Sequence, residues 1–491
     1  MAESVAKEAK LVARHTSIYG LANVMERAVG FVMIPVYTRF LTPADYGILE
    51  LIYLTTSVIS IVVGLGIESA VSRFYFDYKD ERSRGLVMST AAIGYGSVAI
   101  AVVLMLLPLS GFLAGEVLDS SNNALWFQIA LITLCFNFVM PISMAFLRVR
   151  QQSTFLMVTQ VLKTLLTLGL NIYFVVVLQT GVTGILLASL ITAALFTVGM
   201  TAYTLSRTGL GVDFKLLIQM AKFGLPLIPS NIAAFIVQAS DRYFIKAYAS
   251  LSLTGIYSLG YKFGTLVHQF VTAPFIQIWI PRRFEYFEKE DTEHIYARIF
   301  TYFCIVSVMG GLIISLLSRE IIMIMADRAY WSAYKVVPIV VLAYIAFSFH
   351  YHFNIGILMK KATKYIAYIN VANGALNLAL NFLLISRFDM WGAAIATLIC
   401  FIFKAYMTYY FSNRLHKIHI EWRRVTTLFA VGFVLYFCGL LIETGSIWWN
   451  LAIKAVIGLA YPFVLYLVRM FDESEISKFK QIIRTRKISV D

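Results

Sequence analysis

Charge is scarce in this 491-residue chain, and cysteine is scarcer still. Only 14% of the residues are charged and 59% are hydrophobic, whereas soluble domains carry about 25% charged residues. This shortage of charge excludes an ordinary globular enzyme, a disordered chain and a coiled coil, so the bilayer must be the solvent. The four cysteines lie inside apolar runs without a CxxC pair, which predicts buried small hydrophobic residues rather than disulfides or metal ligands.

Long apolar runs recur along the whole sequence. A helix crosses a bilayer with about 20 apolar residues, and the runs predict an all-α polytopic membrane protein with about 14 transmembrane helices. Pro226 and Pro229 interrupt one run, where they predict a kink. The predicted spans lie near residues 16–40, 46–67, 85–107, 124–146, 154–177, 183–205, 220–240, 253–279, 299–318, 335–358, 365–385, 391–412, 425–442 and 447–468.

The positive charge is distributed by side of the membrane. The net charge is +14, and alternate connectors hold 29 of the 41 Lys and Arg residues, whereas the opposite connectors hold seven. Because cytoplasmic loops carry the excess of Lys and Arg, both termini are predicted to be cytoplasmic. The charge therefore orients the chain, and we expect no nucleic-acid partner.

Two parts of the chain repeat each other at a fixed offset. Gly47 and Gly255 lie 208 residues apart, and so do Gly184 and Gly392. A polar stripe in the span 154–177 recurs 210 residues later; its members are Gln160, Lys163, Thr164, Thr167 and Asn171, followed by Asn370, Asn373, Gly374, Asn377 and Asn381. An even number of spans between the copies predicts two six-helix lobes of the same orientation, at 1–212 and 213–415, with two further helices and a tail at 416–491.

Several basic residues lie at the centre of a span. A lysine there costs about 2.5–3.5 kcal/mol if it faces lipid, so we expect these side chains to face a wet cavity or a partner. Their number exceeds that of nearby acids, which favours an anionic head group such as a pyrophosphate. The predicted cavity residues are Asn23, Arg27, Gln160, Lys163, Asn171, Lys262, Asn373 and Asn377.

Acidic residues in or near the spans are candidates for ion coupling or gating. No GxxxxGK[ST] motif is present, so an ion gradient or the supply of substrate would drive transport. Glu26 with Arg27, and Asp241 with Arg242, can instead form structural pairs, and this alternative stays open. The predicted coupling or gate residues are Glu26, Glu50, Asp241 and Arg242.

The remaining polar residues of the spans have simpler interpretations. Lys404 and Lys454 are expected to extend their amines to a membrane interface. His350 and His352 are two residues apart, about 200° around a helix, so they are interpreted as structural. We predict neither a metal site nor a cofactor.

Three segments carry a resemblance to a known family. They are RAVGFVMIPVYTRFLTPADYGILEL at 27–51, KFGLPLIPSNIAAFIVQASDRYFI at 222–245 and TGIYSLGYKF at 254–263. In these segments the chain resembles the polysaccharide transport branch of the multidrug/oligosaccharidyl-lipid/polysaccharide exporters, the O-antigen flippases of Wzx type. Glu26 and Arg27 are similar to charged residues in the first helix of the lipid II flippases of the same superfamily.

The resemblance implies a flippase rather than an enzyme. Such a protein moves an undecaprenyl-pyrophosphate-linked oligosaccharide across a bacterial cytoplasmic (inner) membrane by alternating access, for cell-surface polysaccharide synthesis. The implied partners are the lipid-linked glycan, membrane lipids, a coupling ion (H+ or Na+) and the glycan assembly machinery. Two alternatives stay open: an ion-coupled small-molecule or multidrug exporter of the same superfamily, and a membrane glycan polymerase.

Overall fold

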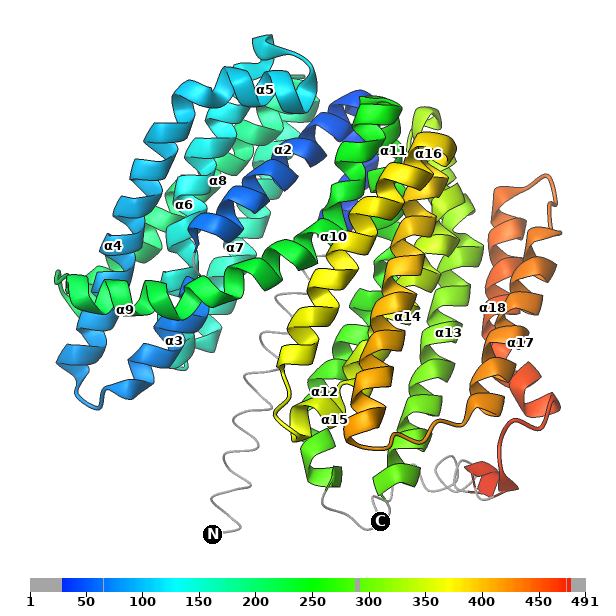
Figure 1. Cartoon of the computed structure of the whole chain (residues 1–491). Helices are drawn as coiled ribbons and strands as arrows, with labels where there is room; N and C mark the ends of the chain where they lie inside the picture. Colours follow the sequence, from blue (N-terminus) through cyan, green and yellow to red (C-terminus); the bar gives the residue numbers. More distant parts are fainter. Residues whose placement is uncertain (1–28, 65, 288–291, 474, 478–491) are drawn as a thin grey trace. The chain divides into compact units, whose positions relative to one another are not determined.

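The computed structural model describes residues 29–64, 66–287, 292–473 and 475–477, and throughout them the regular structure is helical, with no strand. The described residues fall into two compact units (Figure 1). The first unit runs to Ser258 and includes Met325–Tyr330; the second comprises the described residues of Leu259–Ile324 and Trp331–Asp491. The lobes predicted at 1–212 and 213–415 follow the sequence repeat instead, and they stay a prediction. Asn23, Glu26 and Arg27 lie outside the described residues.

The first unit is a bundle of long apolar helices. Thr42 begins α2 with a capping box, in which its side chain and that of Asp45 each bond the other's backbone N–H. The elements are a helix Val29–Phe40, α2 Pro43–Val63, α3 Ile67–Asp77, α4 Glu81–Leu106, η1 Leu107–Leu109, α5 Ser110–Leu118, η2 Ser121–Asn123, α6 Ala124–Val149, α7 Ser153–Ile172, η3 Tyr173–Val177, α8 Gly181–Thr208, α9 Phe214–Gly224, η4 Leu225–Leu227 and α10 Ile228–Tyr248.

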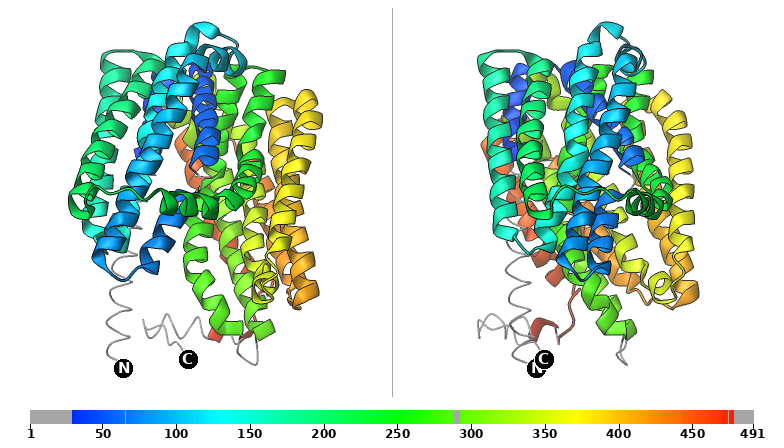
Figure 2. Two further views of the ribbon diagram at one scale, coloured as in Figure 1. Left: turned by 60° about the vertical axis from the view of Figure 1, so that its left-hand side comes forward. Right: turned by 90° about the vertical axis from the view of Figure 1, so that its left-hand side faces the viewer.

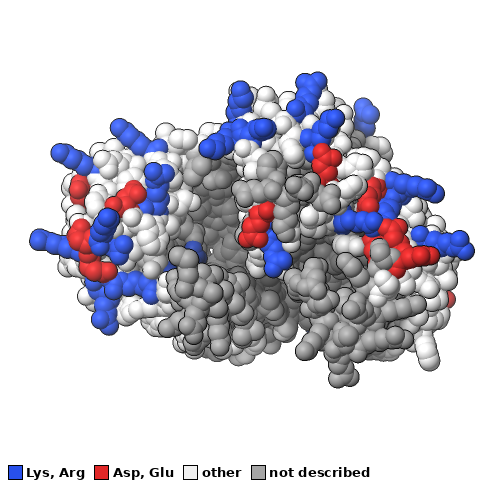
Figure 3. Space-filling model, turned by 90° about the horizontal axis from the view of Figure 1, so that it is seen from below, with Lys and Arg blue, Asp and Glu red and all other residues white. Residues whose placement is uncertain are grey.

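Helices α4, α6 and α8 pack side by side in this unit (Figure 2). Gly85 near the start of α4 touches the backbone at the end of α8, because a Cβ there would lie 2.8 Å from the Thr208 carbonyl oxygen. Arg150, at the end of α6, forms an ion pair with Glu81 in the first turn of α4. The charge pattern assigns the connectors at these helix ends to one side of the membrane. The contacts place those connectors at the same end of the bundle. Figure 3, which views the structure from below, shows Lys and Arg side chains on the described surface.

The second unit contains the longest helices. Its elements are the later part of α11 Leu251–Gly264, then η5 His268–Thr272, α12 Ala273–Phe287, α13 Thr292–Met325, most of η6 Arg328–Val336, α14 Val337–Phe353, α15 Ile355–Met359, α16 Lys364–Leu415, α17 Trp422–Leu440 and α18 Ile447–Leu467. Helix α16 is interrupted at Asp389, whose φ of 48° is not helical. Across this break Asn377 bonds Cys400 at 3.6 Å, so α16 is a hairpin of two antiparallel helices.

The predicted repeat is visible in the packing within each unit. Gly184 of α8 packs on Phe174, where a Cβ would lie 2.7 Å from the Phe174 Cβ. In α16 a Cβ on Gly392 would overlap the Leu384 carbonyl oxygen. Leu384 is the residue 210 positions after Phe174, so both copies contain the same close helical hairpin. The offset is 210 residues before the turn of the hairpin and 208 after it, so the two-residue difference falls in the turn. There the first copy has a π-helical stretch at 173–177, and the second has a single break at Asp389.

Ten described helices are long and apolar enough to cross a membrane, or eleven with the bent pair α9 and α10. One of the ten is the α16 hairpin, which contains two predicted spans. The bent pair meets at 48° beside Pro226, as the two prolines predict. The all-helical membrane fold is thus confirmed, and the count of 14 spans stays a prediction. Contrary to expectation, Cys438 is exposed on α17, because its helix presents that face outward.

Candidate functional site

A pocket of about 450 Å³ lies within the first unit. It is enclosed by the helix Val29–Phe40 together with α2, α6, α7 and α8, so every wall belongs to a membrane-spanning or apolar helix. Its volume falls in the range of about 300–1,000 Å³ that is usual for ligand pockets. The polar residues that line it are Tyr37, Tyr53, Thr56, Thr133, Asn137, Gln160, Lys163, Thr164, Thr167, Asn171, Ser189 and Thr192.

The predicted polar stripe of α7 forms one wall of the pocket. All five of its members line the cavity, because spacings of three and four residues place them on one side of a helix. The hydroxyl of Thr167 donates to the Lys163 carbonyl oxygen at 2.8 Å, as threonines in apolar helices commonly do. The structure therefore brings together Gln160, Lys163 and Asn171, three of the predicted cavity residues.

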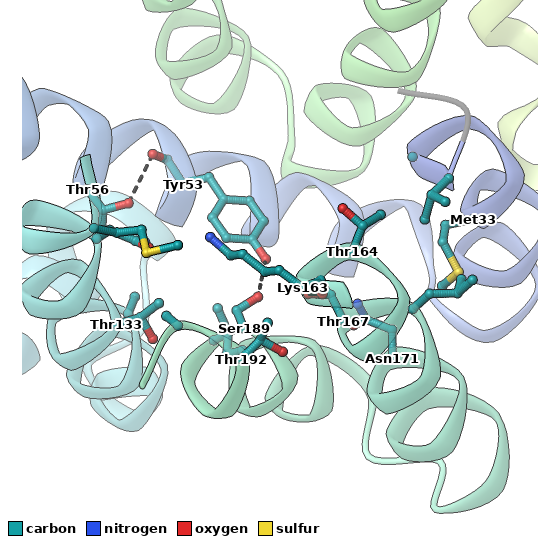
Figure 4. A pocket seen from close by; sticks show the side chains of 18 of the residues that line it. Met33, Tyr53, Thr56, Thr133, Lys163, Thr164, Thr167, Asn171, Ser189 and Thr192 are labelled. Carbon is teal, nitrogen blue, oxygen red and sulfur yellow. Dashed lines mark hydrogen bonds between the residues drawn. The ribbon is translucent and has the colours of Figure 1, made fainter. Parts of the chain in front are cut away.

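Lys163 is the one charged side chain among the described lining residues, none of which is acidic. In Figure 4 its ammonium lies beside Tyr53 and Thr56 of α2. A strongly hydrated ammonium inside a membrane bundle attracts anions, and here the surrounding groups are hydroxyls and amides. The described part of the lining therefore carries one cation among neutral polar groups, which fits a ligand with one anionic group and several hydroxyls.

Helices α2, α6 and α8 contribute polar groups that the sequence reasoning missed. The hydroxyls of Thr56 and Thr133 donate to carbonyl oxygens of their own helices, at 3.0 and 2.7 Å. Tyr53 and Ser189 lie 3.5 Å apart, oxygen to oxygen, across the pocket. The sequence signal for these residues is helical spacing: i, i+3 for Tyr53 and Thr56 and for Ser189 and Thr192, and i, i+4 for Thr133 and Asn137. No sequence pattern tells which helices surround α7.

Other predicted cavity residues lie in the second unit. Lys262 is exposed on α11. Asn373 and Asn377 are buried in α16, where Asn377 accepts a hydrogen bond from Asn381 at 3.1 Å. The stripe that lines a pocket in the first unit is thus packed within a helical hairpin in the second, and neither asparagine lines the pocket of the first unit.

Asp241 and Arg242 form a buried ion pair at 2.7 Å within the first unit. Their side chains are only 1% and 4% exposed. Asp241 also accepts a hydrogen bond from Tyr257 at 2.6 Å, and Arg242 donates to the Gln238 carbonyl oxygen at 2.6 Å. The ion pair lies within α10, and the bond from Tyr257 links it to α11. Glu50 is half-buried on α2.

The expectation that Lys404 and Lys454 reach a membrane interface is wrong for Lys454. Its amine is buried against Glu320 of α13 at 2.5 Å, because α18 packs its polar position against an acid that lies far away in sequence. Lys404 is half-buried with its amine 4.9 Å from the centre of the Phe347 ring, a cation–π contact. His352 is stacked on Trp279 in the core of the second unit. Within the described residues, no three His, Cys, Asp or Glu side chains are grouped as metal ligands.

The comparisons with known proteins agree with this fold. The family described as polysaccharide biosynthesis protein matches residues 12–287. The structure resembles the lipid II flippase MurJ in an inward closed conformation, with a TM-score of 0.75 and 13% identity over 91% of this chain and 97% of the other. No curated protein sequence matches the chain.

Multidrug transporters share the fold as well. An inward-facing MATE family transporter of the MOP superfamily matches with a TM-score of 0.64 and 14% identity, over 79% of this chain and 94% of the other. A MATE transporter in the straight conformation matches at 0.53 with 14% identity, over 82% and 95% of the two chains. These matches show that the chain has the fold of a multi-pass membrane protein, shared with the lipid II flippase and the MATE transporters. The chain belongs to the polysaccharide biosynthesis protein family.

Proposed function

We propose that the protein translocates a polyprenyl-pyrophosphate-linked oligosaccharide from the cytoplasmic to the periplasmic leaflet of a bacterial cytoplasmic membrane. Transport would proceed by alternating access, with both termini on the cytoplasmic side. The observation that carries the proposal is the pocket of the first unit, in which Lys163 is the one charged described lining residue, among hydroxyls and amides. The family and the flippase-like fold support it.

The chemistry of the pocket matches the two parts of such a head group. A phosphate needs a cation to replace its hydration inside the membrane, and Lys163 supplies one. Sugars are neutral and are bound through hydroxyls and amides, which Thr133, Asn137 and Ser189 provide. The polyprenyl chain needs no polar site, because it remains in the bilayer. A protein of this kind binds and moves its substrate without changing it.

The other predicted residues remain proposals. Arg27, Asn23, Lys262, Asn373 and Asn377 are proposed to contact substrate at some stage of transport. Glu26, Glu50, Asp241 and Arg242 are proposed as coupling or gate residues, for H+ or Na+. The buried pair of Asp241 and Arg242 favours an anchoring role for these two.

Native mass spectrometry of the purified protein tests the proposal directly. A bound species with the mass of a polyprenyl-pyrophosphate glycan is expected with the unmodified chain, and its signal should fall at least about tenfold in Lys163→Met, the change expected when a charged contact is lost. Recovery of phospholipids alone from membranes that contain the glycan lipid would overturn it.

A small-molecule exporter of the same superfamily is the second candidate, and the fold of the MATE transporters favours it. Export of drug cations calls for acidic side chains in the pocket, whereas the described lining has a lysine and no acid. Overexpression would then confer drug resistance without any effect on surface polysaccharide. The flippase predicts the opposite pair of results.

A further inference from the structure

Helix α9 lies across the first unit instead of running along it. In Figure 1 and Figure 2 it crosses α3 and α4 near one end of the bundle, and the turn between α3 and α4 extends beyond it. One side of α9 packs into the apolar core, where Leu216 and Met220 are buried beside residues of α3 and α4. Because α4 is long and apolar enough to cross a membrane, a helix that lies across it runs along the membrane surface.

Two hydrogen bonds fix the start of α9 against α4. The Ser89 hydroxyl donates to the Gly211 carbonyl oxygen at 2.7 Å, and the Asp213 backbone N–H donates to the Thr90 hydroxyl at 3.0 Å. Thr90 is nine residues after Glu81, where α4 begins, so this attachment lies about 13 Å along α4 from its charged end. Lipid head groups occupy about 5–7 Å on each side of the hydrocarbon core, which places α9 near the boundary between head groups and acyl chains.

The exposed surface of α9 is divided into an apolar face and a basic face. Phe214 and Ile218 are four residues apart and so share one face, where they are 72% and 54% exposed. Lys215 and Lys222 are seven residues apart, about two turns, and both are exposed on the neighbouring face, about a quarter turn away. An interfacial helix of this kind buries its apolar face among acyl chains and keeps its basic face at the head groups.

The basic face carries cations without counter-charges from the protein. Neither Lys215 nor Lys222 forms an ion pair with another described residue. Arg73 of α3 adds a third such cation, and its guanidinium lies 5.3 Å from the centre of the Phe223 ring of α9. Asp213, the acid just before α9, is occupied as the helix cap, because its carboxylate accepts hydrogen bonds from two backbone N–H groups. The surface is therefore complementary to phosphate groups.

We propose that α9 is an interfacial helix that binds acidic phospholipids of the adjoining leaflet. Lys215, Lys222 and Arg73 bind the phosphates, while Phe214 and Ile218 lie among the acyl chains. A phospholipid meets both faces at once, whereas a soluble anion would meet the basic face alone and leave the apolar face in water. This lipid differs from the cargo of the pocket, none of whose described lining residues belongs to α3 or α9.

A fluorophore on the apolar face reports which lipid lies beside it. Bimane is attached at Ile218→Cys in the full chain, after Cys438→Ser and Cys135→Ala have removed the exposed and half-exposed thiols. The vesicles contain equal amounts of phosphatidylglycerol and phosphatidylcholine, and one of the two carries a nitroxide on its acyl chain, which quenches bimane at close range. Bimane at Val198→Cys, on a position of α8 that is 60% exposed, is the reference for a lipid-facing site outside α9.

The unmodified basic face should select the acidic lipid. Both nitroxide lipids should quench bimane at residue 218, with an apparent affinity for phosphatidylglycerol at least about fivefold higher, the factor expected for one lysine near an anionic surface. The double variant Lys215→Gln with Lys222→Gln should bring this preference close to one. The double variant Lys79→Gln with Arg82→Gln is the matched control, because it removes the same charge from exposed positions in and beside the turn between α3 and α4, and it should keep the preference.

Three results would overturn the inference. Bimane at residue 218 that neither lipid quenches would mean that lipid does not cover the apolar face. Equal quenching by the two lipids in the unmodified chain would mean that α9 does not select acidic lipid. Loss of the preference in the Lys79 and Arg82 variant as well would assign it to the charge of the whole end of the bundle. None of these results bears on the proposed function, which Lys163→Met tests separately.

Discussion

Gly47 of α2 and Gly255 of α11 pack backbone against backbone, and each is the repeat equivalent of the other. A Cβ on Gly47 would overlap the Leu251 carbonyl oxygen and lie 3.1 Å from the Gly255 nitrogen. A Cβ on Gly255 would overlap the Pro43 carbonyl oxygen and lie 2.9 Å from the Gly47 nitrogen. Since Pro43 and Leu251 are also 208 residues apart, the two helices meet through a locally symmetric contact.

Alanine at either glycine should force α2 and α11 apart. We expect Gly47→Ala and Gly255→Ala each to lower the free energy of unfolding by about 1–3 kcal/mol, because the obstacle is backbone and cannot rotate away. Gly199→Ala on α8 is the control, since its Cβ would meet no atom within 4 Å and alanine favours the helix. Thermal or denaturant unfolding in detergent measures the difference, and equal stability of all three variants would show that the close contact does not form.

Much of this fold could be predicted from apolar runs and the repeat. The hydrophobic runs placed the helices, and the offset of 208 identified Gly47 and Gly255 before any contact was known. The break at Asp389 also falls where the sequence predicts it, in the connector between the spans 365–385 and 391–412. The partner of Lys454 could not be found, since Glu320 lies 134 residues away and only packing joins them.

The site was predictable along α7 and not around it. Helical periodicity placed Gln160, Lys163 and Asn171 on one face, and all three line the pocket. Periodicity does not tell what a face meets: the equivalent stripe of α16 is buried, with Asn377 bonded to Cys400. The residues of α2, α6 and α8 that complete the pocket depend on tertiary packing, which one sequence does not specify.

Lys454 and Glu320 should behave as a coupled buried pair. Their side chains are 3% and 2% exposed, so Lys454→Met leaves an uncompensated buried carboxylate and should cost about 3–5 kcal/mol of stability. The double variant Lys454→Met with Glu320→Leu should recover most of this loss, because both charges are then gone. A double-mutant cycle on unfolding in detergent measures the coupling, and additive effects of the two changes would contradict it.

A neighbouring pair provides the matched control. Arg319, next to Glu320 on α13, forms an ion pair with Glu443, which follows α17 and is 64% exposed to solvent. Exposed ion pairs contribute little, so Glu443→Gln should change stability far less than Lys454→Met. A comparable loss from both changes would mean that burial does not set the strength of the Lys454 pair.

The segment after α18 should detach from the second unit in acid. Burial alone would raise the pKa of the Glu475 carboxyl, but hydrogen bonds from Arg424, Tyr302 and the Asp472 backbone N–H outweigh it and lower the pKa to about 2. A carboxyl with a lowered folded pKa stabilises docking above its ordinary pKa of about 4.3, and this contribution is lost as the pH falls towards 2. Docking should thus be firm at pH 7 and weak below about pH 3.

A nitroxide attached at Glu473→Cys, in a Cys438→Ser background, measures this docking. Spin-label mobility should stay low from pH 7 to about pH 4 and rise below it. Arg424→Gln removes the 2.7 Å contact with Glu475 and should move the rise to higher pH. Mobility that is independent of pH in both proteins would show that Glu475 does not hold the segment.

The charge of Lys163 should decide transport more than its shape. Export of glycan in cells should be lost in Lys163→Met and Lys163→Glu and retained in part by Lys163→Arg, which keeps a cation for the phosphate. Lys262→Met is expected to reduce export as well, since that residue is also a predicted cavity residue. Membrane levels of each variant, measured by immunoblot, control for failed insertion.

The most direct measurement is translocation of a polyprenyl-pyrophosphate glycan in vesicles that contain only this protein and lipid. Thr204→Val is the control, because Thr204 is buried on α8 and does not line the pocket. The unmodified chain and this control should move the head group across the bilayer, and Lys163→Met should do so at least about tenfold more slowly, the loss expected for a charged contact to phosphate. Equal rates for the unmodified chain, Lys163→Met and Lys163→Glu would contradict a cationic pocket as the site that carries the lipid's phosphate.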